Sequence, residues 1–269
     1  MHKQITSPQN PFIKELVLLK EKSRNRKKSG LFLLEGFREI ELALAGRFVP
    51  SKIVYCSDIC NAEEVLTIEN ESQYAIEFIS VTKEVYAKIA YRETTEGIVA
   101  VVSAKTHRLE DVVFKRDHPL LLIAEAPEKP GNIGALLRTA DAANIDAVFI
   151  ANPKTDIYNP NIIRSSVGCL FTTQIATGTT DEILDYLEKH QITSYAAALK
   201  SDSAPYQNQD FTRPTAIVVG TESTGLSDAW LERASKKIII PMLGKIDSMN
   251  VSVAASILIF EATRQRNFS

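Results

Sequence analysis

Near its C-terminus the sequence reads Ile238-Ile-Ile-Pro-Met-Leu-Gly-Lys-Ile-Asp-Ser-Met-Asn-Val-Ser-Val-Ala-Ala-Ser-Ile-Leu-Ile-Phe-Glu-Ala-Thr-Arg-Gln-Arg266. The three isoleucines are β-branched and predict a buried strand, which Pro241 ends because proline cannot donate to a β-ladder. After a polar bend, residues 251–260 are apolar almost all round, so we expect a helix that is buried rather than laid on the surface. A buried strand, a polar loop and a buried helix in this order indicate an α/β fold.

The polar bend of this stretch has two interpretations. As structure, it begins a capped core helix: Ser248 or Asn250 suits the N-cap, and Arg264 with Arg266 suits the negative end of the helix dipole. As function, a polar loop between a buried strand and a buried helix is a common position for a site in an α/β protein. Taken alone, these residues favour the structural interpretation.

Strand-like and helix-like segments alternate along the rest of the chain. In the first half we expect strands at residues 31–36, 52–56, 75–80 and 97–102, with helices at 11–28, 39–45 and 82–89. In the second half we expect strands at 120–124, 147–151, 171–175, 194–199 and 215–219, with helices at 132–144, 161–168 and 181–190. Such alternation implies a mostly parallel sheet covered by helices on both faces.

The length of 269 residues allows one large or two ordinary domains. We expect an amino-terminal domain over residues 1–104, a linker or short connecting helix over 105–118, and a second domain over 119–269. With 45% hydrophobic residues the chain can bury a sizeable core. A net charge of −2 argues against a protein that coats nucleic acid everywhere, but it leaves local basic patches open.

Basic residues are in local excess over the first fifty positions. The helix expected at residues 11–28 places Phe12, Leu16 and Leu19 on one face and ends in a basic tail. Two interpretations of this tail stay open: it contacts phosphates, or it is a solvated charge run before a domain. The basic tail consists of Lys22, Arg24, Arg26, Lys27 and Lys28.

Residue usage argues against several kinds of site. Cys56, Cys60 and Cys169 make no disulfide framework, which fits a reducing cytoplasm. We predict no metal site, because the four histidines are scattered and no further Cys or His lies near Cys56 and Cys60. Residues 1–14 do not resemble a signal peptide, and no apolar run approaches the ~20 residues that span a bilayer. We therefore expect a cytoplasmic protein.

Three polar loops of the second half hold the residues suited to chemistry. The first leads to Arg138, which lies off the apolar stripe of its helix and faces solvent, a cleft or a partner, or pairs with Asp141. The second is Gly220-Thr-Glu-Ser-Thr-Gly-Leu226, whose glycines permit positive φ or close approach of a ligand. The third is the bend with Ser248 and Asn250. No Walker loop and no Gly-x-Gly-x-x-Gly occurs, so a Rossmann-type nucleotide site lacks its usual motif.

In combination and order, these loops resemble the motifs of the SpoU/TrmH branch of the SPOUT RNA methyltransferases. Residues 132–140 are similar to Asn-x-Gly-x-x-x-Arg-Thr-Ala, residues 220–226 to Gly-x-Glu-x-x-Gly-Leu, and residues 240–254 to Ile-Pro-Met…Ser-Leu-Asn-Val-Ser-x-Ala. The segment Arg164-Ser-Ser-Val-Gly168 also resembles a polar family segment. The resemblance covers roughly residues 119–266, and three ordered motifs make it specific.

The amino-terminal half resembles, more weakly, a substrate-binding domain built like certain large-subunit ribosomal proteins. Residues 33–36 and 96–100 carry this likeness. In the second half two residues depart from the family pattern. Met249 replaces the usual leucine, a swap that conserves volume, and Thr221 stands where asparagine is common before the glutamate.

The resemblance implies transfer of a methyl group from S-adenosylmethionine to a ribose 2′-hydroxyl of rRNA or tRNA. It implies a SPOUT domain with a parallel sheet, helices on both faces and a deep C-terminal trefoil knot, which is rare among chain topologies. It also implies a homodimer formed through the C-terminal domain. The alternative is a non-catalytic RNA-binding protein that retains the fold, but Asn132, Arg138 and Asn250 are all present and favour the enzyme.

Roles for single residues follow from the same resemblance. For Arg138 two interpretations remain, a general base or a charged group that holds a phosphate and stabilises the alkoxide, because a guanidinium normally stays protonated. Arg164 joins the basic tail as a residue expected to bind RNA. The catalytic set is Asn132, Arg138, Glu222, Ser248 and Asn250, and the set for the cofactor is Gly220, Thr221, Ile240, Leu243 and Met249.

Overall fold

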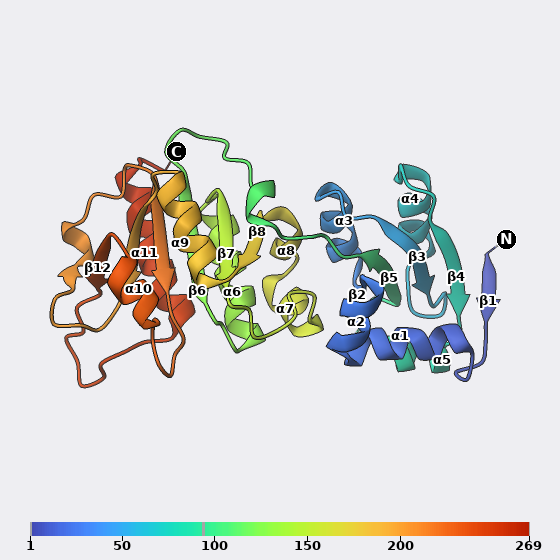
Figure 1. Ribbon diagram of the computed structural model, residues 1–269. Helices are drawn as coiled ribbons and strands as arrows, with labels where there is room; N and C mark the ends of the chain where they lie inside the picture. The colour runs from blue at the N-terminus through green and yellow to red at the C-terminus, as the bar shows by residue number, and fades with distance from the viewer. Residues whose placement is uncertain (1, 93–94, 269) are drawn as a thin grey trace. The chain divides into compact units, whose positions relative to one another are not determined.

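The computed structural model describes residues 2–92 and 95–268, so the outer ends of the two expected domains, Met1 and Ser269, lie outside the described residues. The chain divides into two compact units (Figure 1). The first contains Met1–Thr106 together with Ile157–Thr172, and the second contains His107–Asp156 together with Thr173–Ser269. Residues 157–172 therefore pack with the first unit, although the expected boundaries assign them to the second domain.

The first unit is built on a five-stranded mixed sheet of order β1-β4-β3-β5-β2. β1, β4 and β3 are mutually parallel, and β5 runs antiparallel to both β3 and β2. α3 and α4 cover one face of this sheet, and α1 and α5 cover the other (Figure 1). The strands are β1 (Lys3–Ile5), β2 (Leu31–Glu35), β3 (Pro50–Tyr55), β4 (Glu77–Val81) and β5 (Ile98–Ser103). The helices are α1 (Pro11–Glu21), α2 (Ser23–Ser29), α3 (Phe37–Ala45), α4 (Ala62–Glu71), α5 (Lys83–Ile89), α7 (Pro160–Ser166) and α8 (Cys169–Thr172).

The prediction of a single helix over residues 11–28 is wrong, because the helix is interrupted at Lys22. This residue is extended, with φ −116° and ψ 112°, and separates α1 from α2. The guanidinium of Arg26 explains the break: it is buried and donates to the carbonyl oxygens of Leu19 and Lys20, at 2.7 and 3.2 Å. These carbonyls lie in the last turn of α1 and would otherwise lack partners.

The strand expected over residues 171–175 is also wrong. Residues 169–172 form the short helix α8, and the strand β8 begins only at Ile175. Phe171 packs in the core of the first unit, where its ring lies 5.0 Å from that of Phe48 and 6.2 Å from that of Phe32. The apolar residues at this position thus belong to the helix α8 and not to a strand, since tertiary packing overrides local propensity.

The second unit is built on a seven-stranded sheet of order β10-β12-β9-β11-β6-β7-β8. Every pair of neighbouring strands is parallel. All residues of β6, β7 and β11 are buried, as expected for parallel strands covered on both faces. The mostly parallel α/β fold is confirmed for this unit. The strands are β6 (Leu120–Glu125), β7 (Ala147–Ala151), β8 (Ile175–Gly178), β9 (Thr193–Ala197), β10 (Ala204–Pro205), β11 (Thr215–Val219) and β12 (Lys236–Ile239).

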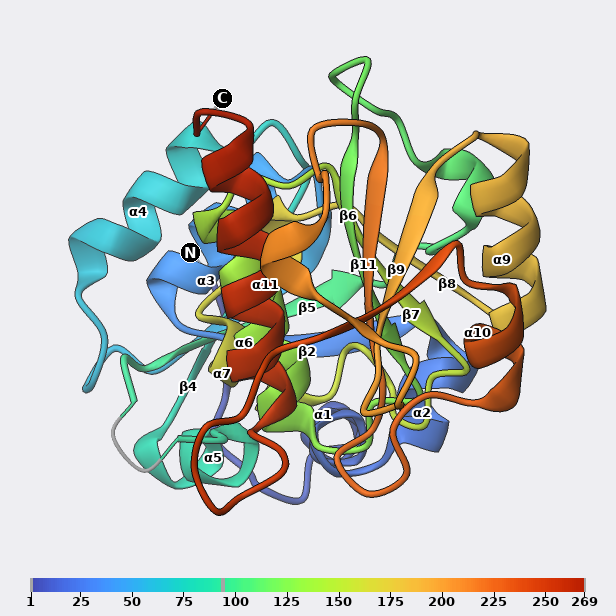
Figure 2. The ribbon, with the colours of Figure 1, turned by 90° about the vertical axis from the view of Figure 1, so that its left-hand side faces the viewer.

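Helices cover both faces of this sheet. α6 and α11 lie side by side on one face, and α9 and α10 lie on the other (Figure 2). The helices are α6 (Pro130–Ala142), α9 (Thr180–Lys189), α10 (Asp228–Arg233) and α11 (Val251–Gln265), with single 3-10 turns η1 (Leu109–Asp111) and η2 (Tyr206–Asn208).

The helix α11 is not buried all round, contrary to expectation. Ala255, Leu258 and Ile259 are fully buried, but Val253 is 50% exposed and Phe260 is 41% exposed. One face packs on the sheet and on α6, while the opposite apolar face meets solvent. A helix whose residues are apolar on every side is therefore not always buried on every side within a single chain.

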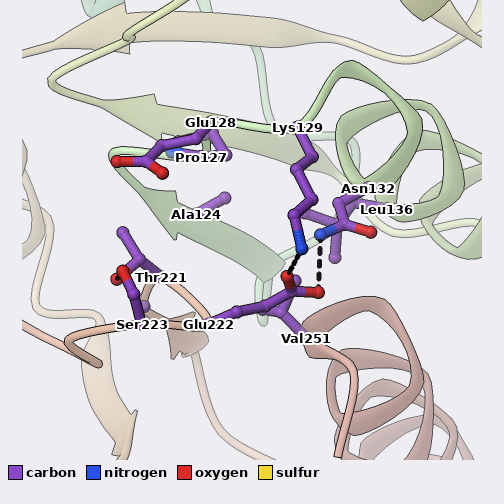
Figure 3. A pocket seen from close by; sticks show the side chains of 11 residues that line it. Ala124, Pro127, Glu128, Lys129, Asn132, Leu136, Thr221, Glu222, Ser223 and Val251 are labelled. Atoms are coloured by element: carbon purple, nitrogen blue, oxygen red, sulfur yellow. Dashed lines mark hydrogen bonds and ion pairs between the residues drawn. The ribbon is translucent and has the colours of Figure 1, made fainter.

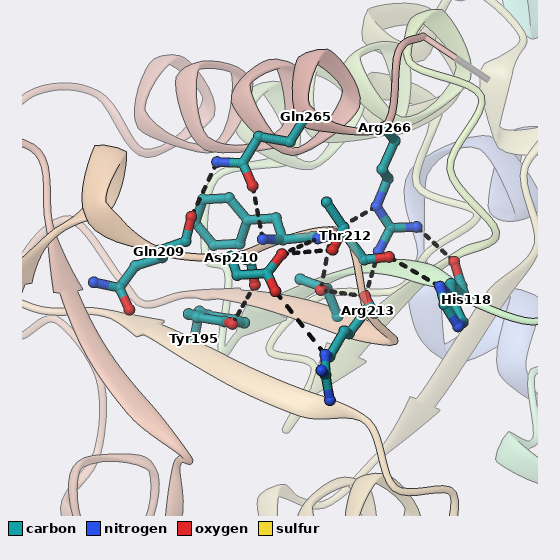
Figure 4. Close-up of polar contacts among 10 residues, drawn as sticks. His118, Tyr195, Gln209, Asp210, Thr212, Arg213, Gln265 and Arg266 are labelled. Atoms are coloured by element: carbon teal, nitrogen blue, oxygen red, sulfur yellow. Dashed lines mark hydrogen bonds and ion pairs between the residues drawn. The ribbon is translucent and has the colours of Figure 1, made fainter.

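The C-terminal end of α11 is anchored by polar contacts (Figure 4). Arg266 donates to the carbonyl oxygens of His118, Pro119, Phe211 and Arg213, which belong to two earlier loops. Gln265 accepts from the backbone N–H of Phe211 at 2.8 Å. These contacts fix the far end of the helix whose first residues enter the candidate site.

Candidate active site

The loop after β11 folds back on itself, and two glycines make this possible. Thr221 and Gly225 exchange two backbone hydrogen bonds of 3.0 and 3.2 Å. Gly225 has φ +71°, a conformation that glycine adopts without strain. A Cβ at Gly220 would lie 2.3 Å from the backbone of Gly225, so any larger residue would force the two ends of the loop apart. The closed loop holds Glu222 at a fixed place beyond β11.

Glu222 is the centre of a hydrogen-bonded cluster drawn from all three predicted loops. Its Oε1 accepts from the side-chain amide of Asn132 at 2.9 Å and from that of Asn250 at 2.7 Å. Its Oε2 pairs with the ammonium of Lys129 (Figure 3). Asn250 also donates to Oδ1 of Asn132, at 3.2 Å. Residues more than a hundred positions apart thus meet beyond the carboxyl ends of β6 and β11, and we name them the Glu222 cluster.

Asn250 has two roles at once. Its Oδ1 caps α11 by accepting from the backbone N–H of Ser252 at 2.9 Å, while its Nδ2 belongs to the Glu222 cluster. Of the two N-cap candidates, Asn250 is the cap. The amide can take only this orientation, because a flip would point its oxygen at the carboxylate of Glu222 and its NH₂ at a backbone donor.

The cluster favours the ionised form of Glu222. The hydrogen bond from Lys129 is the main cause that lowers the pKa of Glu222 below its usual range, and the hydrogen bonds from Asn132 and Asn250 add to it. Each of these donors favours the charged form of the carboxylate. Glu222 therefore acts at neutral pH as an acceptor of hydrogen bonds.

A cavity of about 410 Å³ opens beside this cluster and follows the carboxyl ends of β9, β11 and β12. Its size lies in the range of small-molecule sites. Among the residues expected to contact a cofactor, Gly220, Thr221, Ile240 and Met249 line it, and so does Ser248. Leu243 does not line it and is 98% exposed. We name this space the cofactor cavity.

A second cavity, of about 310 Å³, is also bordered by this loop (Figure 3). The segment 220–223 and Val251 border both cavities. The remaining walls of the second cavity come from the end of β6, the loop 127–129 and the first turns of α6. Glu222 therefore stands where the two cavities meet.

Arg138 lies outside the Glu222 cluster. It is exposed on α6, two turns beyond Asn132. The neighbouring Thr139 faces α11, where its hydroxyl lies 2.8 Å from that of Ser256. The structure thus brings Asn132, Glu222 and Asn250 together, places Ser248 in the cofactor cavity, and leaves Arg138 at the surface beside the pair of helices α6 and α11.

Comparison with known families agrees with this arrangement of motifs. Residues 119–260 match the description "SpoU rRNA Methylase family", and residues 10–100 match an "MRM3-like substrate binding domain". The chain belongs to the SpoU rRNA methylase family. The resemblance inferred from the three loops is confirmed.

Two similar sequences and one similar structure are described below. A Bacillus subtilis protein named 23S rRNA (guanosine(2553)-2′-O)-methyltransferase RlmP is 29% identical over 96% of this chain and 98% of its own length. A Thermus thermophilus tRNA (guanosine(18)-2′-O)-methyltransferase is 36% identical over 65% of this chain and 86% of its own. The structure of AviRb from Streptomyces viridochromogenes in complex with AdoMet superposes with a TM-score of 0.87, at 27% identity, over 96% of this chain and 99% of that one.

The residues expected to bind RNA all lie in the first unit, but they are not equivalent. Lys22, Arg24, Lys27 and Lys28 are exposed, and so is Arg164 on α7. Arg26 is only 5% exposed and stabilises the end of α1. Arg26 is thus a structural residue within the basic tail.

Lys129 is a site residue that sequence reasoning missed. It precedes the first motif and pairs with Glu222 across 93 positions. A lysine before Pro130 at the start of a helix matches no motif, so the sequence did not indicate a role for it. The carboxylate of Glu222 reaches Lys129 only because the loop after β11 folds toward it. Residues 197–200 also line the cofactor cavity and were missed, and Leu226, which ends the second motif, was not assigned to the cofactor.

Within residues 2–92 and 95–268, no group of three or more His, Cys, Asp or Glu side chains is placed to hold a metal ion. No helix among those residues has the length and apolar character needed to cross a membrane.

Proposed function

We propose that this protein transfers a methyl group from S-adenosylmethionine to a ribose 2′-hydroxyl of rRNA or tRNA. The observation that carries the proposal is the meeting of three family motifs around Glu222, directly beside a cavity of about 410 Å³. Relatives that match the chain over most of its length are named 2′-O-methyltransferases, and a structural neighbour is described with AdoMet.

The residues of the cofactor cavity fit S-adenosylmethionine. Ile239 and Met249 offer apolar surface to an adenine ring, and the backbone at Gly220 and Ile240 offers fixed donors and acceptors to its edge. The close approach of Gly220 to Gly225 keeps that backbone free of side chains. When bound, the cofactor supplies an electrophilic methyl group on a sulfonium sulfur.

The chain itself positions the acceptor. Asn132, Glu222 and Asn250 form a hydrogen-bonded polar wall beside the cofactor cavity, and positioning dominates a reaction that needs an in-line approach. Arg138 keeps its charge, holds a phosphate next to the acceptor ribose and stabilises the 2′-oxygen while its proton passes to solvent water. Ser248 lines the cofactor cavity and orients the bound groups there.

RNA binding belongs to the first unit in this proposal. Residues 10–100 match a substrate-binding domain, and the exposed Lys22, Arg24, Lys27 and Lys28 supply positive charge for phosphates. Arg164 lies in the same unit and lines a small cavity together with Lys20 and Arg92.

We also propose a homodimer formed through α11, a trefoil knot at the C-terminal end, and a cytoplasmic location. The exposed apolar side chains Val253 and Phe260 support the dimer, since a partner would remove them from water. The knot is what the family resemblance implies, and the contacts of Arg266 hold the end of the last helix against the loops near residues 118 and 211.

Two measurements test the proposed function. Calorimetry with S-adenosylmethionine should show binding, and labelled-methyl transfer should occur to a 23S rRNA transcript or to an unmodified tRNA pool. Arg138→Ala should lower the rate of transfer at least a hundredfold and leave cofactor binding unchanged, because Arg138 lies outside the cofactor cavity. RNA binding without any cofactor binding or transfer would favour the non-catalytic alternative.

A further inference from the structure

The second cavity has no role in the function proposed above. At about 310 Å³ it is large enough for a small ligand, and only the segment 220–223 and Val251 separate it from the cofactor cavity. A group bound there would lie against the Glu222 cluster. The space also adjoins the first turn of α6, a helix of 13 residues whose positive end favours anions.

Lys129 is the cation among the residues that line this cavity. Its side chain is 70% exposed, and among the described residues its ammonium contacts Glu222 alone. Glu222 does not depend on this one contact, because Asn132 and Asn250 both donate to its Oε1. Exposed ion pairs contribute little to stability, so Lys129 can leave Glu222 at low cost.

We propose that the second cavity receives the acceptor nucleotide of the RNA, and that Lys129 exchanges the Glu222 carboxylate for a backbone phosphate of that nucleotide. The inference rests on the proposed function and names the place where its RNA substrate enters. A lysine binds phosphate as a point charge, and Lys129 extends from the cavity wall toward Glu222 (Figure 3).

The exchange has a consequence for Glu222. Once Lys129 moves to phosphate, Oε2 loses its partner while Oε1 keeps the two asparagine amides. Glu222 borders both cavities. It is then the acceptor for a ribose hydroxyl that lies between the nucleotide and the cofactor, and it positions that hydroxyl.

The salt dependence of RNA binding tests this inference. The affinity of the protein for a 23S rRNA transcript and for an unmodified tRNA pool is measured at several salt concentrations without cofactor. Lys129→Met should weaken binding of the accepted RNA several-fold and lower the slope of log K against log salt by about 0.7–0.9, the value for one neutralised phosphate. Lys129→Arg should keep both values close to those of the wild type.

Two further variants serve as controls: one should strengthen RNA binding and the other should leave it unchanged. Glu128 lines the same cavity and carries the wrong charge for phosphate, so Glu128→Gln should strengthen RNA binding about twofold. Lys189 lies at the end of α9, on the opposite face of the sheet, and Lys189→Met should change nothing.

The outcomes separate the inference from the proposed function. An unchanged salt slope in Lys129→Met overturns the role of Lys129, even if methyl transfer persists. Loss of S-adenosylmethionine binding in that variant also overturns it, since Lys129 would then only hold Glu222. If the wild type binds no cofactor, the proposed function fails, but the slope measured with RNA alone still decides whether Lys129 contacts phosphate.

Discussion

At the scale of single residues, the site depends on donors that converge on one carboxylate. Glu222 accepts from Lys129, Asn132 and Asn250, which come from two other loops. The three donors lower its pKa, so the folded protein binds a proton at this group less readily than the unfolded chain does. The resulting stability is complete above the ordinary pKa of a glutamate, near 4.3, and is lost as the pH falls through the lower pKa of the folded state.

A titration of Glu222 checks this description. In the wild type, carbon-13 NMR of its carboxyl group should give a pKa below the ordinary glutamate value. Lys129→Met removes the largest cause of the shift, so the pKa should rise toward that value while remaining below it, because both asparagine amides still donate. The same pKa in both proteins would show that Lys129 does not hold Glu222 in solution.

At the scale of elements, α11 is held at both ends by different means. Asn250 caps its start, and Arg266 and Gln265 tie its end to the loops 118–119 and 209–213 (Figure 4). Between these ends the helix packs against α6 and the sheet through Ala255, Leu258 and Ile259. The position of the cap, and hence of the Glu222 cluster, depends on this anchoring.

Substitution of Arg266 should measure the anchoring. Arg266→Ala removes donors to four carbonyl oxygens, and charge-assisted hydrogen bonds that are partly buried suggest a decrease of about 2–3 kcal/mol in the free energy of unfolding. Arg264 is the matched control: it is exposed and pairs with Glu261, so Arg264→Ala should lower the free energy of unfolding far less than Arg266→Ala does. Urea unfolding measures both, and equal decreases would mean that the four hydrogen bonds do not stabilise the helix end.

At the scale of the whole molecule, charge is distributed unevenly although the net charge is only −2. The exposed members of the basic tail lie on or next to α2, in the unit that matches a substrate-binding domain. Their contribution to RNA binding is electrostatic and should therefore depend on salt.

Replacement of Lys22, Arg24, Lys27 and Lys28 by Gln should weaken RNA binding and lower the salt slope by about 0.7 for each phosphate that is no longer neutralised. Arg26 is left in place, because its removal would expose the last carbonyls of α1. Lys83→Gln on α5 serves as a control in the same unit. An unchanged slope in the quadruple variant would identify the basic tail as a solvated charge run.

The sequence alone predicted most elements and the three loops of the site. Periodicity sufficed for buried strands such as β6 and β11, because burial on both faces leaves a continuous apolar run. It failed at Phe171, which packs in a core made by distant residues, and at Lys22, where the buried Arg26 ends a helix that local propensity would continue. Lys129 was missed because its partner Glu222 is close only in three dimensions.

The double role of Asn250 restricts how this chain can change. Its side-chain oxygen caps α11 and its side-chain nitrogen donates to Glu222, so one residue is needed both for folding and for the site. Serine or aspartate would still cap the helix but would lose the amide donor. A descendant that gives up its chemistry yet keeps its fold should therefore lose Asn132 or Glu222 freely, whereas position 250 should drift only among residues that cap helices.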